Sequence, residues 1–286
     1  MLTRRRFSAL AAAAAGATLA APLRSQAAVT RSGESFGVQL FTVRNDIKDL
    51  AATLGMIYRI GYATVETFPA VYNRPARDLK KLIEGRGLKA PSGHFDYATL
   101  EEKVDYAAEL GLEYMICPMI PRPMWDSLDG FKQGAQHLNK IAAQARAAGL
   151  KFGYHPHDYE FRPIQGGRGF DVLMRELDPS VRLELDIFWA AEASQDPLEL
   201  MRKNRERLAL IHIKDRKPGA AVSYVPDAQA ARSITEAGAG DIDWKAVLGE
   251  ARRLGVKQYF VDQDETALPI EESLRVNWNY LSQLNF

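Results

Sequence analysis

The sequence predicts an α/β fold in which eight parallel strands, each followed by a helix, close into a single barrel. Short apolar runs alternate with segments whose apolar residues recur at helical spacing, which is typical of strand-helix units around a parallel sheet. The chain has 286 residues, and the part after residue 28 has the length of one such barrel. An open doubly wound sheet is the alternative, but no Gly-x-Gly-x-x-Gly motif follows the first apolar run to receive a dinucleotide.

Each strand is expected where an apolar run is short, and each helix where the apolar period lengthens. The expected strands are 36–42, 63–68, 88–94, 114–118, 152–155, 181–187, 208–213 and 258–262. The expected helices are 46–60, 75–86, 97–110, 128–148, 170–177, 196–205, 242–254 and 270–284. Gly166, Gly167 and Gly169 predict a loop, and the long connection 216–240 is interpreted as a mobile lid over the catalytic face.

The first residues have the pattern of an export signal. Arg4, Arg5 and Arg6 precede an alanine-rich run, and Ser25-Gln26-Ala27 is a small-x-small cleavage site. We expect 1–28 to be a twin-arginine signal peptide and 29–286 to be the barrel, which predicts a periplasmic protein. A basic amphipathic first helix is the alternative, but the alanine run offers no polar face, and it is too short for a stable membrane span.

Composition argues against a nucleic-acid partner and excludes intrachain disulfides and cysteine-rich zinc sites. The formal charge of +1 becomes −3 when 1–28, with four arginines and no acid, are removed. Neither value favours a nucleic acid as partner. Cys117 is the only cysteine, so neither an intrachain disulfide nor a cysteine-rich zinc site can form. A homo-oligomer is left open, because no surface is singled out.

Polar side chains gather where the expected strands end, which is the catalytic end of such a barrel. Four of the five histidines fall there, and His137 lies in a helix. The polar positions at the strand ends are Thr42, Arg44, Glu66, His94, His155, His157, Glu160, Asp186, His212, Lys214, Asp262 and Asp264. Glu184 is two residues before Asp186, so it lies deeper on the same face and is interpreted as a supporting or structural acid.

Several carboxylates together with an imidazole favour a hard divalent ion. Such a set suits Mn²⁺ first, with Mg²⁺, Co²⁺ or Zn²⁺ as alternatives, because these ions accept carboxylates and keep open positions for substrate oxygens. The competing interpretation is an ion-pair network in which Lys214 and Arg162 neutralise the acids.

The motifs GVQLFTVRND, YHPHDYEF, LELDIFWA, HIKD, GAGDIDW and YFVDQDE span most of the chain in this order. With them the sequence resembles the xylose isomerase-like TIM barrels, a large group of sugar and sugar-phosphate isomerases, epimerases and related dehydratases. The resemblance implies one divalent metal held by Glu160, Asp186, His212 and Asp262, with His155 or His157 as the alternative to Glu160. The sequence differs from the usual family pattern at Asp262 and Ala239, two positions where relatives commonly have glutamate.

The resemblance also implies the chemistry. Glu160 or His155 on one side of the substrate and Asp262 on the other would move a carbon-bound proton through an enediolate. The residues that match substrate-lining positions are Glu66, His94, His157, Trp189 and Lys214. No arginine cluster or glycine cradle for phosphate is evident, so we expect an isomerase or epimerase of an unphosphorylated sugar or keto-sugar.

Three other functions stay open from the sequence. One is a metal-dependent lyase, dehydratase or hydrolase of 3-keto-glycosides or cyclitols, which needs the same metal and base. Another is a nuclease resembling endonuclease IV, which requires several zinc ions and a basic surface. The last is a sugar-binding protein without catalysis.

Overall fold

The computed structural model describes residues 30–225 and 233–286. The expected signal peptide and part of the expected lid lie outside the described residues. Among the described residues, each helix is either too short or too polar to cross a lipid bilayer.

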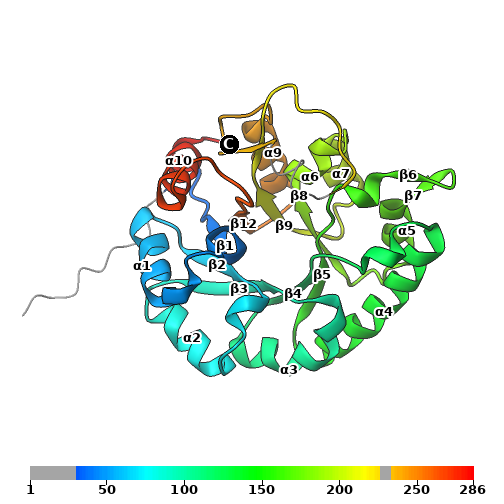
Figure 1. Ribbon diagram of the computed structural model, residues 1–286, viewed down its shortest axis with the longest axis horizontal. Coiled ribbons are helices and arrows are strands. Elements are labelled where there is room, and N and C mark those ends of the chain that lie inside the picture. Colours follow the sequence, from blue (N-terminus) through cyan, green and yellow to red (C-terminus); the bar gives the residue numbers. More distant parts are fainter. Residues whose placement is uncertain (1–29, 226–232) are drawn as a thin grey trace, which may run out of the picture.

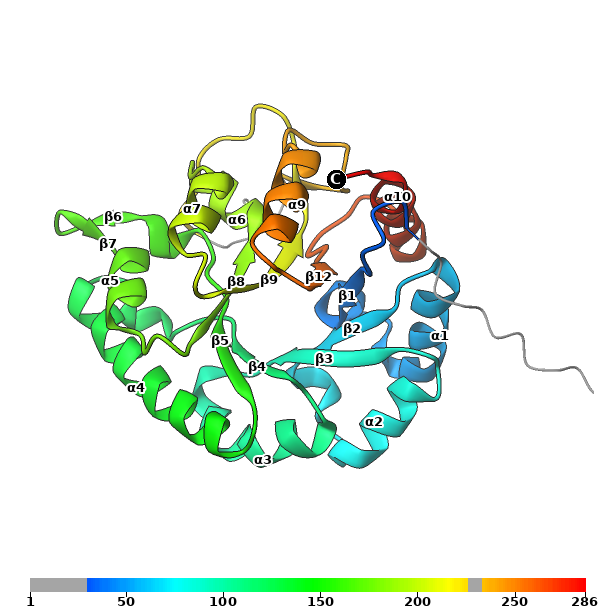
Figure 2. The same ribbon diagram turned by 180° about the vertical axis from the view of Figure 1, so that it is seen from behind.

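Eight parallel strands close into a barrel, which confirms the predicted fold class. Around the barrel the strands follow the order β1-β12-β9-β8-β5-β4-β3-β2, so neighbours in the sequence are neighbours in space and the last strand pairs with the first. Helices surround the strands as an outer ring, and α10 lies beside α1 where the ring closes (Figure 1). Figure 2 shows the same ring from behind, with β12 between β9 and β1.

The barrel strands are β1 (Gly37–Gln39), β2 (Thr64–Thr67), β3 (Lys89–His94), β4 (Tyr114–Cys117), β5 (Lys151–Tyr154), β8 (Arg182–Asp186), β9 (Leu208–Ile213) and β12 (Gln258–Val261). The helices are α1 (Leu50–Ile60), α2 (Ala76–Glu84), α3 (Leu100–Leu110), α4 (Leu128–Ala147), α5 (Gly169–Glu176), α6 (Ile187–Glu192), α7 (Pro197–Lys203), α9 (Trp244–Arg253) and α10 (Ile270–Gln283).

The first strand is shorter than the apolar run that predicted it. After Gln39 the chain turns into a 3-10 helix, Leu40–Val43, and the Gln39 side chain accepts a hydrogen bond from the backbone N–H of Phe41. The expectation of a strand over 36–42 is therefore wrong in its second half. Leu40 and Val43 are buried in this tight turn, whereas Phe41 is exposed.

The sixth barrel strand likewise ends earlier than predicted, at Asp186. Its side chain accepts a hydrogen bond from the backbone N–H of Trp189 and thereby caps α6, a helix that the apolar pattern did not predict. The glycine loop after β5 forms a small hairpin of β6 (Pro163–Ile164) and β7 (Gly167–Arg168). The long loop after β9 carries a second pair, β10 (Asp215–Arg216) and β11 (Ile234–Thr235).

The lower part of the barrel interior is apolar. Ile116, Leu210 and Phe260 form a small buried cluster together with Tyr114. A Cβ atom on Gly37 would lie 2.5 Å from the Phe260 ring, so β1 contributes no side chain there and the ring fills the space. Side chains alternate along a strand, so the next inward positions on β9 and β12 are His212 and Asp262. The polar site therefore sits directly above this apolar layer.

Candidate functional site

The upper part of the site brings two aspartates and a histidine from three adjacent strands together. Asp186, His212 and Asp262 each offer a ligand atom, and these atoms all lie within 4.8 Å of one another. His212 Nδ1 is 3.2 Å from Asp262 Oδ2 and 3.9 Å from Asp186 Oδ2. We call these three residues the upper group. All three lie where the sequence predicts a metal site.

Two oxygens of the upper group have no hydrogen-bond partner. Asp186 Oδ1 caps α6, whereas Asp186 Oδ2 has no hydrogen bond and only an ion pair with Lys214 at 3.1 Å. Asp262 Oδ1 has no hydrogen-bond partner, and both carboxylates are buried. A buried anionic oxygen without a partner is costly, and coordination of a divalent ion is one way to satisfy it. The donor set of the upper group therefore fits a divalent metal.

Lys214 lies between the upper group and Asp264. Its Nζ is 2.7 Å from Asp262 Oδ2 and 3.1 Å from Asp186 Oδ2, it also contacts Asp264, and it lies 5.2 Å from the centre of the Trp189 ring. Burial by itself lowers the pKa of Lys214, but the three carboxylates outweigh burial and raise this pKa above its ordinary value. The ammonium therefore stays charged beside the site.

Below the upper group, three histidines meet around the carboxylate of Glu184. His94, His155 and His212 join Glu184, again with all ligand atoms within 4.8 Å of one another. Glu184 Oε2 is 2.7 Å from His94 Nε2, 3.1 Å from His155 Nδ1 and 3.3 Å from His212 Nε2. Glu66 Oε2 lies 2.6 Å from His212 Nε2 and 3.2 Å from His94 Nε2. We call these five residues the floor group.

The floor group is strongly coupled electrostatically. Burial by itself raises the pKa of Glu66, but His94 and His212 outweigh it and hold that pKa well below its usual range. Burial lowers the pKa of His94, and the carboxylates of Glu66 and Glu184 reverse this and raise it to about 9. In the metal-free protein, protons on these imidazoles balance the two glutamates.

The floor carboxylates determine which ring nitrogens face the upper group. Because His212 turns Nε2 toward Glu66, its Nδ1 faces Asp186 and Asp262. His155 directs Nδ1 to Glu184 and Nε2 to Asp186 at 3.9 Å. A carboxylate behind an imidazole fixes the orientation of a metal-binding histidine in this way. His155 therefore contributes a nitrogen near the upper group from the fifth barrel strand.

Glu160 points away from both groups. Its carboxyl group contacts the Tyr154 hydroxyl at 2.5 Å and accepts a hydrogen bond from the backbone N–H of His157 at 2.9 Å. Burial raises the pKa of Glu160 to about 8. The structure thus places His155, and not Glu160, beside Asp186 at the end of the fifth barrel strand.

His157 and Trp189 lie side by side at the catalytic end, with ring centres 5.4 Å apart. Burial, followed by the positive charge of Lys214, lowers the pKa of His157 to about 3, so its imidazole is neutral. His157 Nδ1 has no hydrogen-bond partner. These two residues therefore offer an apolar ring and a free polar nitrogen.

Sequence reasoning missed two residues that hold Glu66. Gln39 Nε2 donates to Glu66 Oε2 at 2.7 Å, and Ser92 Oγ donates to Glu66 Oε1 at 2.5 Å. Gln39 lies in the mostly apolar run FGVQLFT. Ser92 is two positions before His94 on β3, so it shares the inward face. This spacing is the signal that could have identified Ser92.

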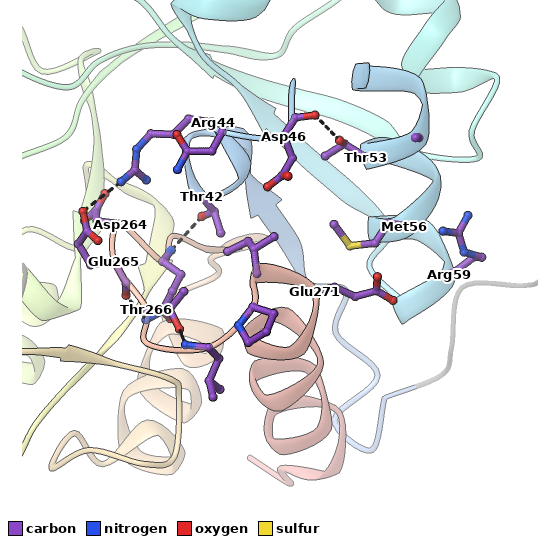
Figure 3. A pocket seen from close by; sticks show the side chains of 16 residues that line it. Thr42, Arg44, Asp46, Thr53, Met56, Arg59, Asp264, Glu265, Thr266 and Glu271 are labelled. Carbon is purple, nitrogen blue, oxygen red and sulfur yellow. Dashed lines mark hydrogen bonds and ion pairs between the residues drawn. The ribbon is translucent and has the colours of Figure 1, made fainter. Parts of the chain in front are cut away.

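A cavity of about 700 Å³ opens beside this site, between the loops after β1 and β12 and the helices α1 and α10 (Figure 3). In Figure 3, Arg44 reaches toward Glu265, and Thr42 lies next to the β12 loop, where its hydroxyl accepts from the backbone N–H of Gln263. The lining includes Asp264 but no member of the upper or floor group. The cavity is therefore a neighbour of the site and not its centre.

Comparison with known proteins identifies relatives that share this fold. The sequence is 24% identical to the inosose dehydratase of Clostridium botulinum in an alignment of 240 residues that covers 71% of this chain and 80% of that protein. A solved sugar phosphate isomerase/epimerase from Parabacteroides distasonis superposes with a TM-score of 0.72 at 24% identity, over 86% of this chain and 97% of the other.

The IOLI protein, solved with a bound zinc atom, superposes with a TM-score of 0.68 at 14% identity, over 86% of this chain and 95% of the other. The sequence profile of the xylose isomerase-like TIM barrels matches residues 54–275, which include seven of the eight barrel strands. The chain therefore belongs to the xylose isomerase-like TIM barrel family.

Proposed function

We propose that the protein is a divalent-metal-dependent isomerase or epimerase of an unphosphorylated sugar or keto-sugar. The observation that carries this proposal is the upper group: Asp186, His212 and Asp262 converge at the catalytic end of the barrel with two buried carboxylate oxygens lacking hydrogen bonds. The relatives named as isomerase/epimerase and dehydratase support an enzyme of this type.

Asp186, His212 and Asp262 would hold the metal, with His155 as the donor from the fifth barrel strand in place of Glu160. Two carboxylates favour Mn²⁺, and Mg²⁺, Co²⁺ and Zn²⁺ remain alternatives. A divalent ion bound there would supply Lewis-acid stabilisation of the negative charge that develops on substrate oxygens when a neighbouring C–H proton leaves.

The chain's own residues provide the proton transfer and the binding of the sugar. Asp262 Oδ1 has no hydrogen-bond partner and is the proposed proton acceptor. Lys214 and His212 keep this carboxylate ionised by holding its pKa well below its usual range, which makes it a weak base until those contacts change. Lys214 is fully buried and contacts three carboxylates, so it positions Asp186, Asp262 and Asp264 around the site. Trp189 and neutral His157 would receive the ring and one hydroxyl of the sugar.

A dehydratase or related lyase of a cyclitol or 3-keto-glycoside is the second candidate. The similarity to an inosose dehydratase favours it. The two candidates share the first proton abstraction and differ in the fate of the resulting enediolate, which is either reprotonated or loses a hydroxyl group.

Proton exchange tests the shared step. The manganese-loaded protein is incubated with keto-sugars and inososes in D₂O, and NMR follows the C–H signal beside the carbonyl. We expect loss of one C–H signal, with an isomeric product for an isomerase or epimerase and a product lighter by one water for a dehydratase. Asp262→Ala should reduce the rate more than substrate affinity. The absence of exchange with every substrate would contradict both candidates and favour a sugar-binding protein.

We further propose that residues 1–28 direct export to the periplasm by the twin-arginine route. The supporting observation is the order of arginines, alanine-rich run and cleavage site. Replacing Arg4 and Arg5 with lysine should leave the protein in the cytoplasm when cell fractions are compared. Unchanged periplasmic accumulation of this variant would contradict the proposal.

A further inference from the structure

The floor group has the arrangement of a metal site in its own right. Its donors come from β2, β3, β8 and β9 and from the residue after β5, so they are fixed by the barrel and not by a loop. The contacts of Glu184 Oε2 and Glu66 Oε2 with the imidazole nitrogens range from 2.6 to 3.3 Å. The two shortest contacts are hydrogen bonds that an ion would replace. The ligand atoms of His94, His155, Glu184 and His212 all lie within 4.8 Å of one another, close to the roughly 3.4 Å that separates donors on one tetrahedral ion.

The floor also lacks a permanent positive charge of its own. Glu66 and Glu184 are fully buried, and the described ion pairs of both involve only histidines. Lys214 contacts the carboxylates of Asp186, Asp262 and Asp264 instead. Glu184 Oε1 has no hydrogen-bond partner although the residue is fully buried. A cation would balance the two glutamates and give this oxygen a partner.

Two imidazoles connect the floor to the upper group. His212 presents Nδ1 to Asp262 and Nε2 to Glu66, and His155 presents Nε2 to Asp186 and Nδ1 to Glu184. The upper group and the floor group therefore share these two rings, each of which turns one nitrogen to either place.

We propose that the floor group binds a second divalent ion, so that the barrel holds a two-metal centre bridged by the His212 imidazole. The two places differ in donor chemistry. The upper group offers carboxylates with one or two imidazoles, whereas the floor offers three imidazole nitrogens with Glu184 and Glu66. Imidazole-rich sites favour Zn²⁺ or Co²⁺, and carboxylate-rich sites favour Mn²⁺ or Mg²⁺. The floor ion is therefore Zn²⁺ or Co²⁺.

Metal stoichiometry of the full-length protein tests the proposal without reference to any substrate. Apoprotein is loaded with Co²⁺, freed of excess metal and analysed for cobalt. We expect about two equivalents in the wild type and about one in His94→Ala, because His94 contacts only the floor. Asp262→Asn should also retain about one. His137→Ala is the matched control, since this histidine packs on Tyr97 outside the site, and it should retain two.

Anomalous diffraction from wild-type crystals grown with Co²⁺ decides the question even if a variant fails to fold. Two peaks, one on each side of the His212 ring, are expected. A single peak, or one equivalent of cobalt that is unaffected by His94→Ala, would overturn the second site. Because neither measurement uses a substrate, this result is independent of the exchange experiment that tests the proposed reaction.

Discussion

At the scale of single residues, Glu66 determines how His212 presents itself to the upper group. Its carboxylate is 2.6 Å from Nε2 and is held in turn by Gln39 and Ser92. The sequence indicated Glu66 as a substrate-lining residue because it lies at a strand end. In the structure, however, the Glu66 carboxylate contacts His94, His212, Gln39 and Ser92. The apolar pattern of the strands does not predict these contacts.

We expect Glu66→Gln to weaken Mn²⁺ binding about 10–100-fold, because a neutral amide orients and polarises the imidazole less than a carboxylate does. Isothermal titration of the apoprotein measures the affinity. Glu101→Gln is the matched control, since Glu101 is an exposed acid that accepts a hydrogen bond from Gln144, and its affinity should equal that of the wild type. Equal affinity in Glu66→Gln would exclude the orienting role.

Glu160 provides a prediction about pH and stability. Burial raises its pKa to about 8 from an ordinary value of 4.5, so the folded protein keeps a proton that the unfolded chain releases. The stability from this group is fully present below pH 4.5 and is lost as pH rises toward 8. Glutamine mimics the protonated form, because its amide can donate to Tyr154 while its oxygen accepts from His157.

We therefore expect Glu160→Gln to gain stability relative to the wild type by about 1.4 kcal/mol per pH unit between pH 5 and 7. Urea unfolding at several pH values measures the difference, and comparison of the two proteins cancels the contributions of the other titrating groups. Parallel pH profiles for wild type and variant would show that Glu160 is already ionised in the folded state.

At the scale of elements, the sequence located every barrel strand and also the ends of β3 and β9, but not how β1 and β8 end. A run such as FGVQLFT or VRLELDI is apolar in a strand and equally apolar in a buried turn, so hydrophobic pattern alone cannot mark the change. The side chains of Gln39 and Asp186 mark it through local hydrogen bonds. The direction of the Glu160 side chain after β5 is likewise set by a local contact, the hydrogen bond with Tyr154. The spacing of residues in the sequence does not reveal this contact.

Asp186 has two separable roles because its oxygens have different partners. We expect both Asp186→Asn and Asp186→Ala to lose binding at the upper group, since neither retains a carboxylate. Asparagine can still accept the hydrogen bond from the Trp189 N–H, whereas alanine cannot. Thermal unfolding without metal should therefore show Asp186→Ala less stable than Asp186→Asn by about 1 kcal/mol. Equal stability of the two would mean that the cap contributes nothing to α6.

At the scale of the whole molecule, barrel closure brings residues from distant parts of the sequence to one place. Glu66 and His212 are 146 positions apart and lie in contact. The barrel was predictable because strand and helix patterns alternate along most of the chain, and closure then sends every strand end to one face. The two-tier arrangement was not predictable, because it depends on which inward layer each polar residue occupies.

Closure also concentrates negative charge. The buried carboxylates of Glu66, Glu184, Asp186 and Asp262 and the partly buried one of Asp264 form ion pairs only with Lys214 and with histidines within the described part of the chain. A divalent ion that binds only the folded barrel relieves this repulsion and stabilises the fold by mass action. At a free metal concentration 100 times the dissociation constant, the gain is about 2.7 kcal/mol.

We expect saturating Mn²⁺ to raise the melting temperature of the EDTA-treated protein by roughly 5–10 °C, as estimated for a domain of this size. Differential scanning calorimetry measures the shift, and the rise should continue with the logarithm of the metal concentration above saturation. Asp186→Asn is the control that lacks the upper carboxylate, and its melting temperature should respond little. If manganese leaves the wild-type transition unchanged, the carboxylates are neutralised by protons and by Lys214 alone, and the ion-pair network becomes the better description of the barrel interior.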